Sequence, residues 1–294
     1  MIAVYALVVL MLLIWGGTYV AAKLVFRSIP PNIVVCVRTI MAAVFIIPVY
    51  MWEVRKRPLV KTWPELRLLI LLGIGGVTVN QVFWTLGVAR TTVVHSAMIM
   101  TTTPLWVLLI AGLLGSERIT AFKAVGMAIA MSGVVLLQIL RARGAAPAGQ
   151  EATLLGDALV LGCALSMAAL TAAAKVWKPL SGGIAISVVG YVGGAVLLGP
   201  LLPFASAGFD YTGIPSGAWL GLLYMSVMSS VVGYLIYCYA LERMPASRLA
   251  TFQYLQPVFA SGLAVLILGE RLGAGAVLAG AIILAGIFVA ERFG

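Results

Sequence analysis

The stretch that decides the fold runs from Gly73 to Thr120 and reads GIGGVTVNQVFWTLGVARTTVVHSAMIMTTTPLWVLLIAGLLGSERIT. It contains two long apolar runs, joined by a short link that carries Arg90. A membrane-spanning helix needs about 20 mostly apolar residues, so we expect spans at roughly 68–88 and 93–113. Barrel strands would instead appear as short segments of alternating polarity. The continuous apolar runs therefore indicate membrane helices.

Outward from this stretch, the same pattern covers most of the chain. Of 294 residues, 63% are apolar and 10% are charged, whereas soluble domains carry roughly 25% charged residues. A soluble fold of this size exposes too much surface to hide so many apolar side chains. This composition excludes a cytosolic enzyme, a secreted disulfide scaffold and a disordered protein. We predict an all-α integral membrane protein with ten transmembrane helices, at roughly 2–22, 32–52, 68–88, 93–113, 120–140, 153–174, 183–204, 216–240, 246–268 and 273–290.

The basic residues indicate a membrane orientation rather than a nucleic-acid partner. The net charge is +10, but the Lys and Arg residues are scattered between apolar blocks, as positive-inside loop charges are. Twelve of the 19 Lys and Arg residues fall in links on the side of the termini, and seven fall on the other side. We therefore expect both termini in the cytoplasm and the protein in a bacterial inner membrane.

The two halves of the chain match each other at an offset of 153 residues. Residues that are rare in membrane helices coincide in order: Arg90 with Arg243, Pro104 with Pro257, Glu117 with Glu270, Arg118 with Arg271, and Gly133 with Gly286. Near an offset of 152, Lys23 falls on Lys175. Chance matching among Ala- and Leu-rich segments is the alternative, and duplication is favoured because Pro, Glu and Arg match without gaps.

We predict a first repeat at 1–144, a Gly-, Ala- and Pro-rich linker at 145–152 and a second repeat at 153–294. Five spans in each half insert the second copy upside down. Inverted repeats are typical of alternating-access transporters, whose substrate site lies near the midplane between the halves. The expected architecture is therefore two inverted five-helix repeats around a central cavity.

Four motifs resemble one known family. The opening stretch resembles the third and fourth helices of EamA-type proteins, which belong to the drug/metabolite transporter superfamily. The stretch YALERMPASRLATFQYLQPVFASGLAVLILGERL (Tyr239–Leu272) resembles the ninth helix of the same family. WGGTYVAAK (Trp15–Lys23) resembles its first helix, and VRTIMA (Val37–Ala42) resembles its second helix. The resemblance covers essentially the whole chain. It implies ten helices, an inverted five-plus-five repeat and a central cavity, and it leaves the substrate open among amino acids, sugars, drugs and other metabolites.

A carrier needs polar or aromatic groups at depth that face a cavity. Such groups form helical stripes in several spans, with Thr18 and Tyr19 beside Trp15. The predicted substrate-binding residues are Trp15, Arg38, Asn80, Gln81, Trp84, His95, Met98, Thr102, Trp106, Tyr234, Tyr237, Gln253, Tyr254 and Gln256. The competing interpretation is structural, because membrane amides also bond neighbouring helices and membrane aromatics also anchor at the interface.

For two of these residues, a specific functional role can be weighed against a structural one. His95 is the only histidine and titrates near neutral pH when unperturbed; proton coupling is conceivable, but an ordinary hydrogen-bonded role is favoured. Arg38 lies about two turns inside the second span, where a cation must snorkel, pair or face water. It could attract a substrate carboxylate through a bidentate contact, and snorkelling is the competing role.

Pro104 and Pro257 are the predicted gating residues. Proline lacks a donor and crowds the carbonyl four residues earlier, so the carbonyls of Met100 and Gln253 are expected to be free. A static kink is the alternative. Glu117–Arg118 and Glu270–Arg271 close the same helices, and we expect them to cap the following helices rather than to catalyse.

The chemistry that is missing also limits the function. No acidic residue stands at mid-depth in any span, and no phosphate-binding loop is present. Cys36, Cys163 and Cys238 lack metal-ligand spacing and are expected to be buried thiols. We therefore predict no enzyme activity, no cofactor and no metal.

The predicted function is a secondary active transporter, an exporter of amino acids or similar amphipathic metabolites. Alternatives are an exporter of drugs or of nucleotide-sugar or sugar-like metabolites, and, less favoured, a membrane scaffold or an intramembrane enzyme. The driving force stays open between proton coupling, exchange and uniport. The expected partners are the lipid bilayer and a small-molecule substrate, with no nucleic acid, and the protein is expected to be a monomer or weak oligomer.

Overall fold

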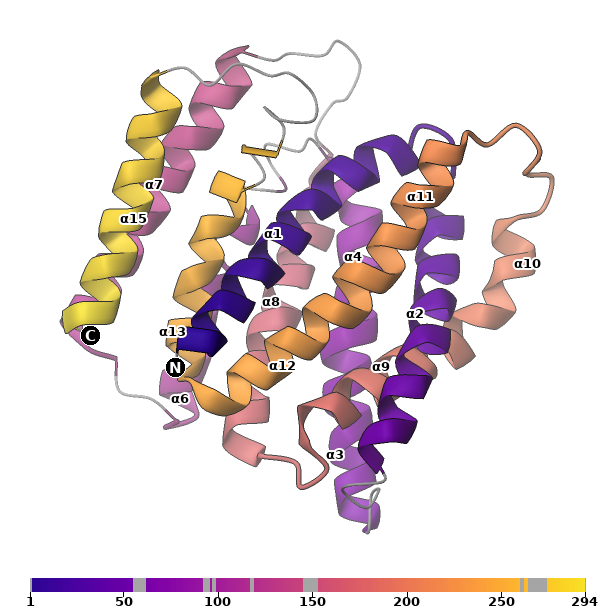
Figure 1. The fold of residues 1–294 in the computed structure, drawn as a ribbon, viewed down its shortest axis with the longest axis horizontal. Helices are drawn as coiled ribbons and strands as arrows, with labels where there is room; N and C mark the ends of the chain where they lie inside the picture. Colours follow the sequence, from indigo (N-terminus) through magenta and orange to yellow (C-terminus); the bar gives the residue numbers. More distant parts are fainter. Residues whose placement is uncertain are drawn as a thin grey trace.

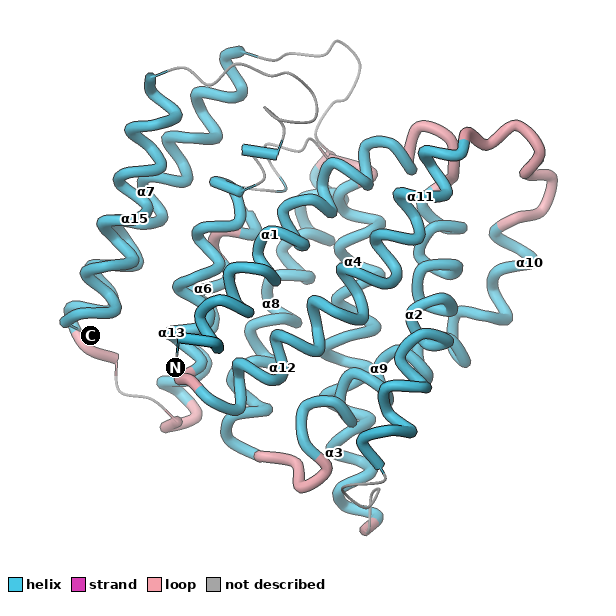
Figure 2. Tube along the Cα trace, viewed as in Figure 1, coloured by secondary structure: helices cyan, strands magenta, loops and turns pink. Residues whose placement is uncertain are grey.

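The computed structural model describes residues 2–54, 62–91, 96, 99–116, 119–144, 153–259, 262–263 and 274–293. Every regular element in these residues is helical (Figure 2). A bilayer core offers no water to backbone N–H and C=O groups, so a spanning segment must satisfy them internally, as a helix does. The predicted all-α fold is therefore confirmed.

The helices follow the predicted spans in order (Figure 1). The first half contains α1 (Ile2–Val25), α2 (Pro31–Val54), α3 (Trp63–Gly73), the π-helical segment η1 (Ile74–Thr78), α4 (Val79–Val88), α6 (Thr103–Leu113) and α7 (Ala121–Gly144). The second half contains α8 (Leu154–Trp177), α9 (Gly182–Leu198), η2 (Gly199–Leu201), α10 (Leu202–Ala205), α11 (Ser216–Tyr224), the π-helical segment η3 (Met225–Gly233), α12 (Tyr234–Arg243), α13 (Ala246–Phe252), η4 (Gln253–Leu255) and α15 (Ala274–Phe293).

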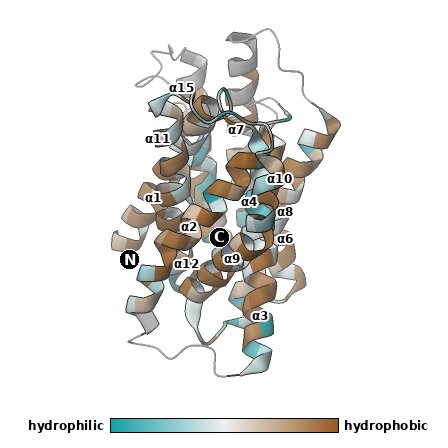
Figure 3. Cartoon of the chain, turned by 90° about the vertical axis from the view of Figure 1, so that its right-hand side faces the viewer, coloured by the Kyte–Doolittle hydropathy of each residue, from teal (hydrophilic) through white to brown (hydrophobic). Residues whose placement is uncertain are grey.

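The outer surface of the bundle is suited to lipid. Within the described residues, six helices are long and apolar enough to cross a membrane, and three shorter apolar helices lie in other predicted spans. Large apolar side chains face outward, including Leu113 at 79% exposure and Phe204 at 80%. Figure 3 shows apolar residues along most of the helices. Both termini lie on the same side of the bundle, the N-terminus near the turn between α12 and α13 and the C-terminus at the end of α15 (Figure 1).

The packing of α7 against α15 has the symmetry of a duplicated chain. A Cβ on Gly286 would lie 2.3 Å from the backbone nitrogen of Ala130, and a Cβ on Gly133 would lie 2.9 Å from that of Ile283. An offset of 153 residues converts one contact into the other. The backbones approach closely because glycine has no side chain, as in other membrane helix pairs. The two repeats therefore meet here through equivalent residues, which we call the glycine seam.

The π-helical segments also occupy equivalent positions. Shifted by 153 residues, η1 falls on residues 227–231, inside η3. A π-helix has hydrogen bonds from i to i+5 and occurs frequently at functional sites. Both segments adjoin the helices that carry the cavity described below, α4 and α12. The spacing of apolar residues in the sequence does not predict them.

The two predicted gating prolines stand at helix interruptions. Pro104 lies in the first turn of α6, and the carbonyl of Met100 accepts a hydrogen bond from Thr103 Oγ1 at 2.7 Å. Pro257 follows η4, where the carbonyl of Gln253 accepts from the backbone N–H of Gln256. Pro104 is thus at a helix start rather than inside a longer helix, and both carbonyls have local partners instead of being free. The pairs Glu117–Arg118 and Glu270–Arg271 lie outside the described residues.

Candidate functional site

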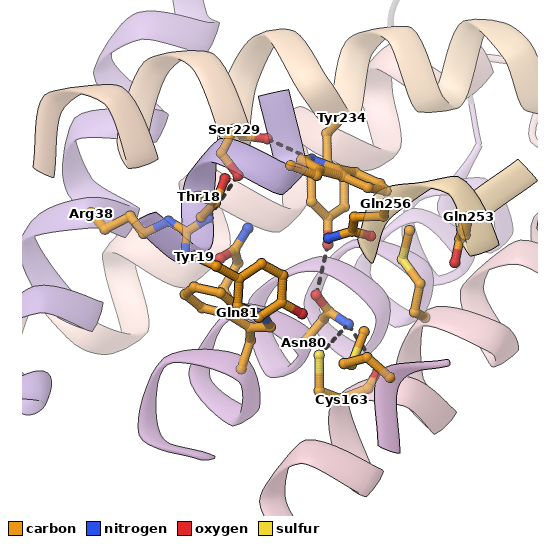
Figure 4. A pocket seen from close by; sticks show the side chains of 14 residues that line it. Thr18, Tyr19, Arg38, Asn80, Gln81, Cys163, Ser229, Tyr234, Gln253 and Gln256 are labelled. Carbon is orange, nitrogen blue, oxygen red and sulfur yellow. Dashed lines mark hydrogen bonds between the residues drawn. The ribbon is translucent and has the colours of Figure 1, made fainter. Parts of the chain in front are cut away.

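A central cavity lies where helices of the two repeats meet. It is about 60 Å³, room for a few water molecules. Its lining residues come from both halves of the chain: Trp15, Thr18, Tyr19, Arg38, Asn80, Gln81, Trp84, Met100, Cys163, Met167, Ser229, Tyr234, Gln253 and Gln256 (Figure 4). A metabolite larger than this space requires the surrounding helices to move apart.

Asn80 joins three helices at the cavity wall. Its Nδ2 donates to the carbonyl of Cys163 at 2.9 Å, to Cys163 Sγ at 3.2 Å and to Ser166 Oγ at 3.2 Å. Its Oδ1 accepts from the Tyr234 hydroxyl at 2.8 Å. A buried amide needs such partners, because an unpaired polar group in an apolar medium is costly. Asn80 therefore ties α4 to α8 and α12 across the repeat boundary.

Gln81 makes a second cross-repeat contact. Its Nε2 donates to the Tyr191 hydroxyl at 3.0 Å and to Ser230 Oγ at 3.4 Å. These partners lie on α9 and in η3. Adjacent amides on α4 thus fix the helix to four elements of the second repeat.

Aromatic rings form much of the remaining wall. Trp15 packs against Tyr234 and Tyr237, with ring centroids 5.8 and 5.7 Å apart, and its Nε1 donates to the carbonyl of Ser229 at 3.2 Å. Tyr19 meets Trp84 edge to face at 5.5 Å. Rings in these arrangements present broad apolar surface to a neighbouring group.

Arg38 is the one cation on the cavity wall among the described residues. Its Nε donates to Ser230 Oγ at 3.0 Å and to the carbonyl of Met225 at 3.3 Å, and its Nη2 donates to Ser229 Oγ at 3.2 Å. Its Cζ lies 5.2 Å from the centre of the Trp84 ring, within cation–π range. No Asp or Glu lines the described part of this wall.

The structure brings eight of the predicted site residues together in this cavity: Trp15, Arg38, Asn80, Gln81, Trp84, Tyr234, Gln253 and Gln256. Four others do not line it: Thr102, Trp106, Tyr237 and Tyr254. Trp106 donates to Thr102 Oγ1 at 3.1 Å, so these two residues pair with each other. Tyr254 is buried in an apolar cluster. His95 and Met98 lie outside the described residues.

Four lining residues were not predicted to face a cavity: Met100, Cys163, Met167 and Ser229. Met100, Cys163 and Met167 carry no signal, because an apolar residue in an apolar span does not reveal which way it faces. Ser229 was missed because side chains in the span 216–240 were compared at α-helical spacing. Ser229 lies in η3, where the wider π-helical turns change which side chains face the cavity.

A second cavity of about 250 Å³ lies between α8, α9 and α12, toward the side of the termini. Its walls include Tyr237, whose hydroxyl hydrogen-bonds that of Thr171. At its rim, Lys175 Nζ donates to the carbonyls of Leu241 and Met244 at 2.6 and 2.8 Å. Glu242 accepts from the backbone N–H of Gly183 at 2.9 Å, which caps the start of α9.

Part of the equivalent wall in the other repeat is more deeply buried. Ala174 and Lys178 line the second cavity and are half-buried and exposed, respectively. The residues that correspond to them at offsets of 152 and 153, Ala22 and Val25, are 1% and 0% exposed. The two repeats therefore pack differently at these positions.

The comparison with known proteins matches this fold and its duplication. The EamA-like transporter family matches residues 2–139 and again residues 154–291. The chain belongs to the EamA-like transporter family. The resemblance seen in the motifs is therefore confirmed, and this EamA-like protein is an integral membrane protein of a transporter family with a two-repeat, ten-helix arrangement.

Individual relatives of this EamA-like protein extend over most of the chain. An "Uncharacterized transporter" from Archaeoglobus fulgidus is 28% identical over 280 residues and covers 95% of each chain. A "Probable terminal-alkyne amino-acid exporter" from Streptantibioticus cattleyicolor is 26% identical over 78% of this chain and 74% of its own length. A solved crystal structure has a TM-score of 0.77 at 17% identity and covers 99% of this chain and 98% of its own, a likeness of fold alone.

Proposed function

We propose that this protein is a secondary transporter that exports a small amphipathic metabolite, an amino acid or a similar compound, by alternating access. The observation that carries the proposal is the central cavity, because both repeats line it and its walls combine side-chain amides with aromatic rings. Amides supply directional hydrogen bonds, and rings supply apolar contact. The described residues include no group of His, Cys, Asp or Glu fit to hold a metal, which favours transport over metal-assisted catalysis.

Amino acids are the favoured substrate class for two reasons. The relative from Streptantibioticus cattleyicolor is named as a probable amino-acid exporter. The wall of the cavity also carries one cation among its described residues, whereas a nucleotide sugar, with its two phosphates, calls for several. Sugars and uncharged drugs remain the alternative class.

The unequal burial of equivalent positions in the two repeats supports alternating access. Ala174 and Lys178 border the cavity of about 250 Å³ between α8, α9 and α12 and are partly or largely exposed, whereas their counterparts Ala22 and Val25 are almost completely buried. We propose that substrate enters from the side of the termini and that this side faces the cytoplasm, in line with its larger share of Lys and Arg. Exchange of the two packings between the repeats would then open the opposite side, with bends at Pro104 and Pro257 serving as gates. A monomer in a bacterial inner membrane is sufficient for this cycle.

The test is uptake or counterflow in liposomes that contain the purified protein. We expect movement of at least one amino acid or related amphipathic compound from a metabolite panel, and we expect Trp84→Ala to lower the rate severalfold. The matched control is Trp219→Ala, because Trp219 lies on the outer face of α11. Folded protein that moves no compound from the panel contradicts the proposal, as does equal loss in both variants.

A further inference from the structure

The guanidinium of Arg38 is almost completely enclosed in the membrane-embedded part of the protein. Arg38 is 3% exposed and lies about two turns into α2. A charge withdrawn from water in this way is costly unless it is paired and hydrogen-bonded. The partners of Arg38 therefore determine what its charge is used for.

The hydrogen bonds of Arg38 do not use all of the N–H donors of its guanidinium. Nε and Nη2 bind the hydroxyls of Ser229 and Ser230 and the carbonyl of Met225, none of which is charged. Nη1 is buried and has no hydrogen-bond partner among the described residues. A guanidinium carries two N–H groups on Nη1. Both are free, and the charge lacks an acidic counter-ion on the described cavity wall.

A second buried donor without a partner lines the same cavity. Nε2 of Gln253 makes no hydrogen bond within the described part of the chain. In Figure 4, Gln253 and Arg38 lie on opposite sides of the cavity, with Tyr19 and Tyr234 between them. The wall thus presents a cation at one end, aromatic surface in the middle and a neutral donor at the other end.

We propose that the ligand of this cavity is an amphipathic monocarboxylate whose carboxylate binds Nη1 of Arg38. The proposal rests on the proposed function and narrows its substrate class. Charge-assisted bonds between a guanidinium and a carboxylate are among the strongest in proteins. A substrate ammonium group is not required, because the described wall offers it no carboxylate. A dianionic phosphate would bring one charge more than Arg38 neutralises.

A purely structural role for Arg38 makes a different prediction. Its bonds to Ser229, Ser230 and Met225 attach α2 to η3, and a residue that only fastens these elements would not discriminate between ligands of different charge. Ligand charge is therefore the readout that separates the two roles.

The experiment measures ligand affinity of the purified full-length protein in detergent, by calorimetry and thermal shift. The probes are aromatic and aliphatic monocarboxylates, each paired with its own amide and amine, such as 3-phenylpropionate, 3-phenylpropionamide and 3-phenylpropylamine. We expect at least one acid to bind about tenfold or more tightly than its amide and amine, as the loss of a charged hydrogen bond predicts. If no acid binds more tightly than its amide, the proposal is overturned.

Variants then test whether Arg38 causes the preference for the acid over its amide. Arg38→Gln should abolish the preference for the acid, and Arg38→Lys should retain part of it because the charge remains without the planar fork. Arg243→Gln, at an exposed arginine on α12, should leave it unchanged. An acid preference that survives in Arg38→Gln overturns the proposal, and if that variant does not fold, the wild-type series and Arg38→Lys decide it.

Transport assays test the proposed function separately from the carboxylate site. Selective binding of acids without movement in liposomes overturns the proposed function and retains the carboxylate site. Movement of amides and acids at equal rates retains transport and overturns the carboxylate site.

Discussion

Asn80 places a side-chain amide where the surroundings make every unpaired polar atom costly. Its side-chain hydrogen bonds go to the second half of the chain: the amide nitrogen donates to Cys163 and Ser166, and the oxygen accepts from Tyr234. An asparagine that bonded only within its own helix would add nothing to the contact between repeats. Asn80 instead fixes the distance between α4 and α12 on one side of the cavity.

Removal of one hydroxyl tests this bond. Tyr234→Phe deletes the donor to Asn80 Oδ1 but keeps the ring that packs against Trp15 and Tyr191. We expect a loss of about 0.5–1.5 kcal/mol in stability, the range for interhelical hydrogen bonds in membrane proteins. Unfolding in detergent micelles provides the measurement.

The control is Tyr239→Phe, at an exposed tyrosine five residues later on the same helix. Its stability should match that of the wild type. Equal losses in the two variants would mean that the Tyr234 hydroxyl adds nothing specific.

At the scale of elements, the helices were predictable and their inner faces were not. Apolar runs such as Gly182–Leu198 specify a helix from composition alone, because a bilayer permits little else. The orientation of side chains within the eighth span was different. Tyr234 and Tyr237 were both predicted from α-helical spacing, but of the two only Tyr234 lines the central cavity, together with Ser229 in the wider turns of η3. No residue pattern in this segment predicts a π-helix.

The residues that line the central cavity could also be predicted only in part. Polar and aromatic residues such as Asn80 and Trp84 stand out in an apolar span, so they could be selected. Tyr254 stands out equally, yet it packs into an apolar cluster, because the sequence does not say which face of a helix meets the other repeat. Partners from the distant half, such as Cys163, carry no signal at all.

The glycine seam between α7 and α15 allows a matched test at this scale. Gly286→Val places side-chain atoms where a Cβ already lies 2.3 Å from the backbone nitrogen of Ala130. We expect destabilisation of about 1–3 kcal/mol, as for other overpacked sites, measured as a lowered midpoint of thermal unfolding.

Gly280→Val is the control, because a Cβ at Gly280 on the same helix meets nothing within 4 Å. Its midpoint should stay close to that of the wild type. A wild-type midpoint in Gly286→Val would show that α7 and α15 do not need their close approach.

At the scale of the whole molecule, equivalent positions of the two repeats differ in burial. Ala174 and Lys178 line the second cavity and are half-buried and exposed, respectively, whereas Ala22 and Val25 are almost completely buried. The rocking mechanism that we propose needs two arrangements of equivalent elements, and a difference of this kind between the repeats is consistent with it.

Thiol labelling tests this difference. In a variant without Cys36, Cys163 and Cys238, we expect Ala174→Cys to react with a water-soluble maleimide faster than Ala22→Cys. Ala174 lines the second cavity and is half-buried, whereas Ala22 is 1% exposed, and the two correspond at an offset of 152. Reaction rates in detergent provide the measurement, and equal rates would contradict the asymmetry.

The twofold contact in the glycine seam has an evolutionary consequence. It is the contact that a five-helix ancestor would make with an inverted copy of itself, an isologous interface. Two identical chains would carry every cavity side chain twice, including any arginine. Within one chain the two halves are free to differ: α2 carries Arg38, whereas α9 carries neither Lys nor Arg. A cavity with a single positive charge is therefore open to this chain and closed to a symmetric dimer of identical halves.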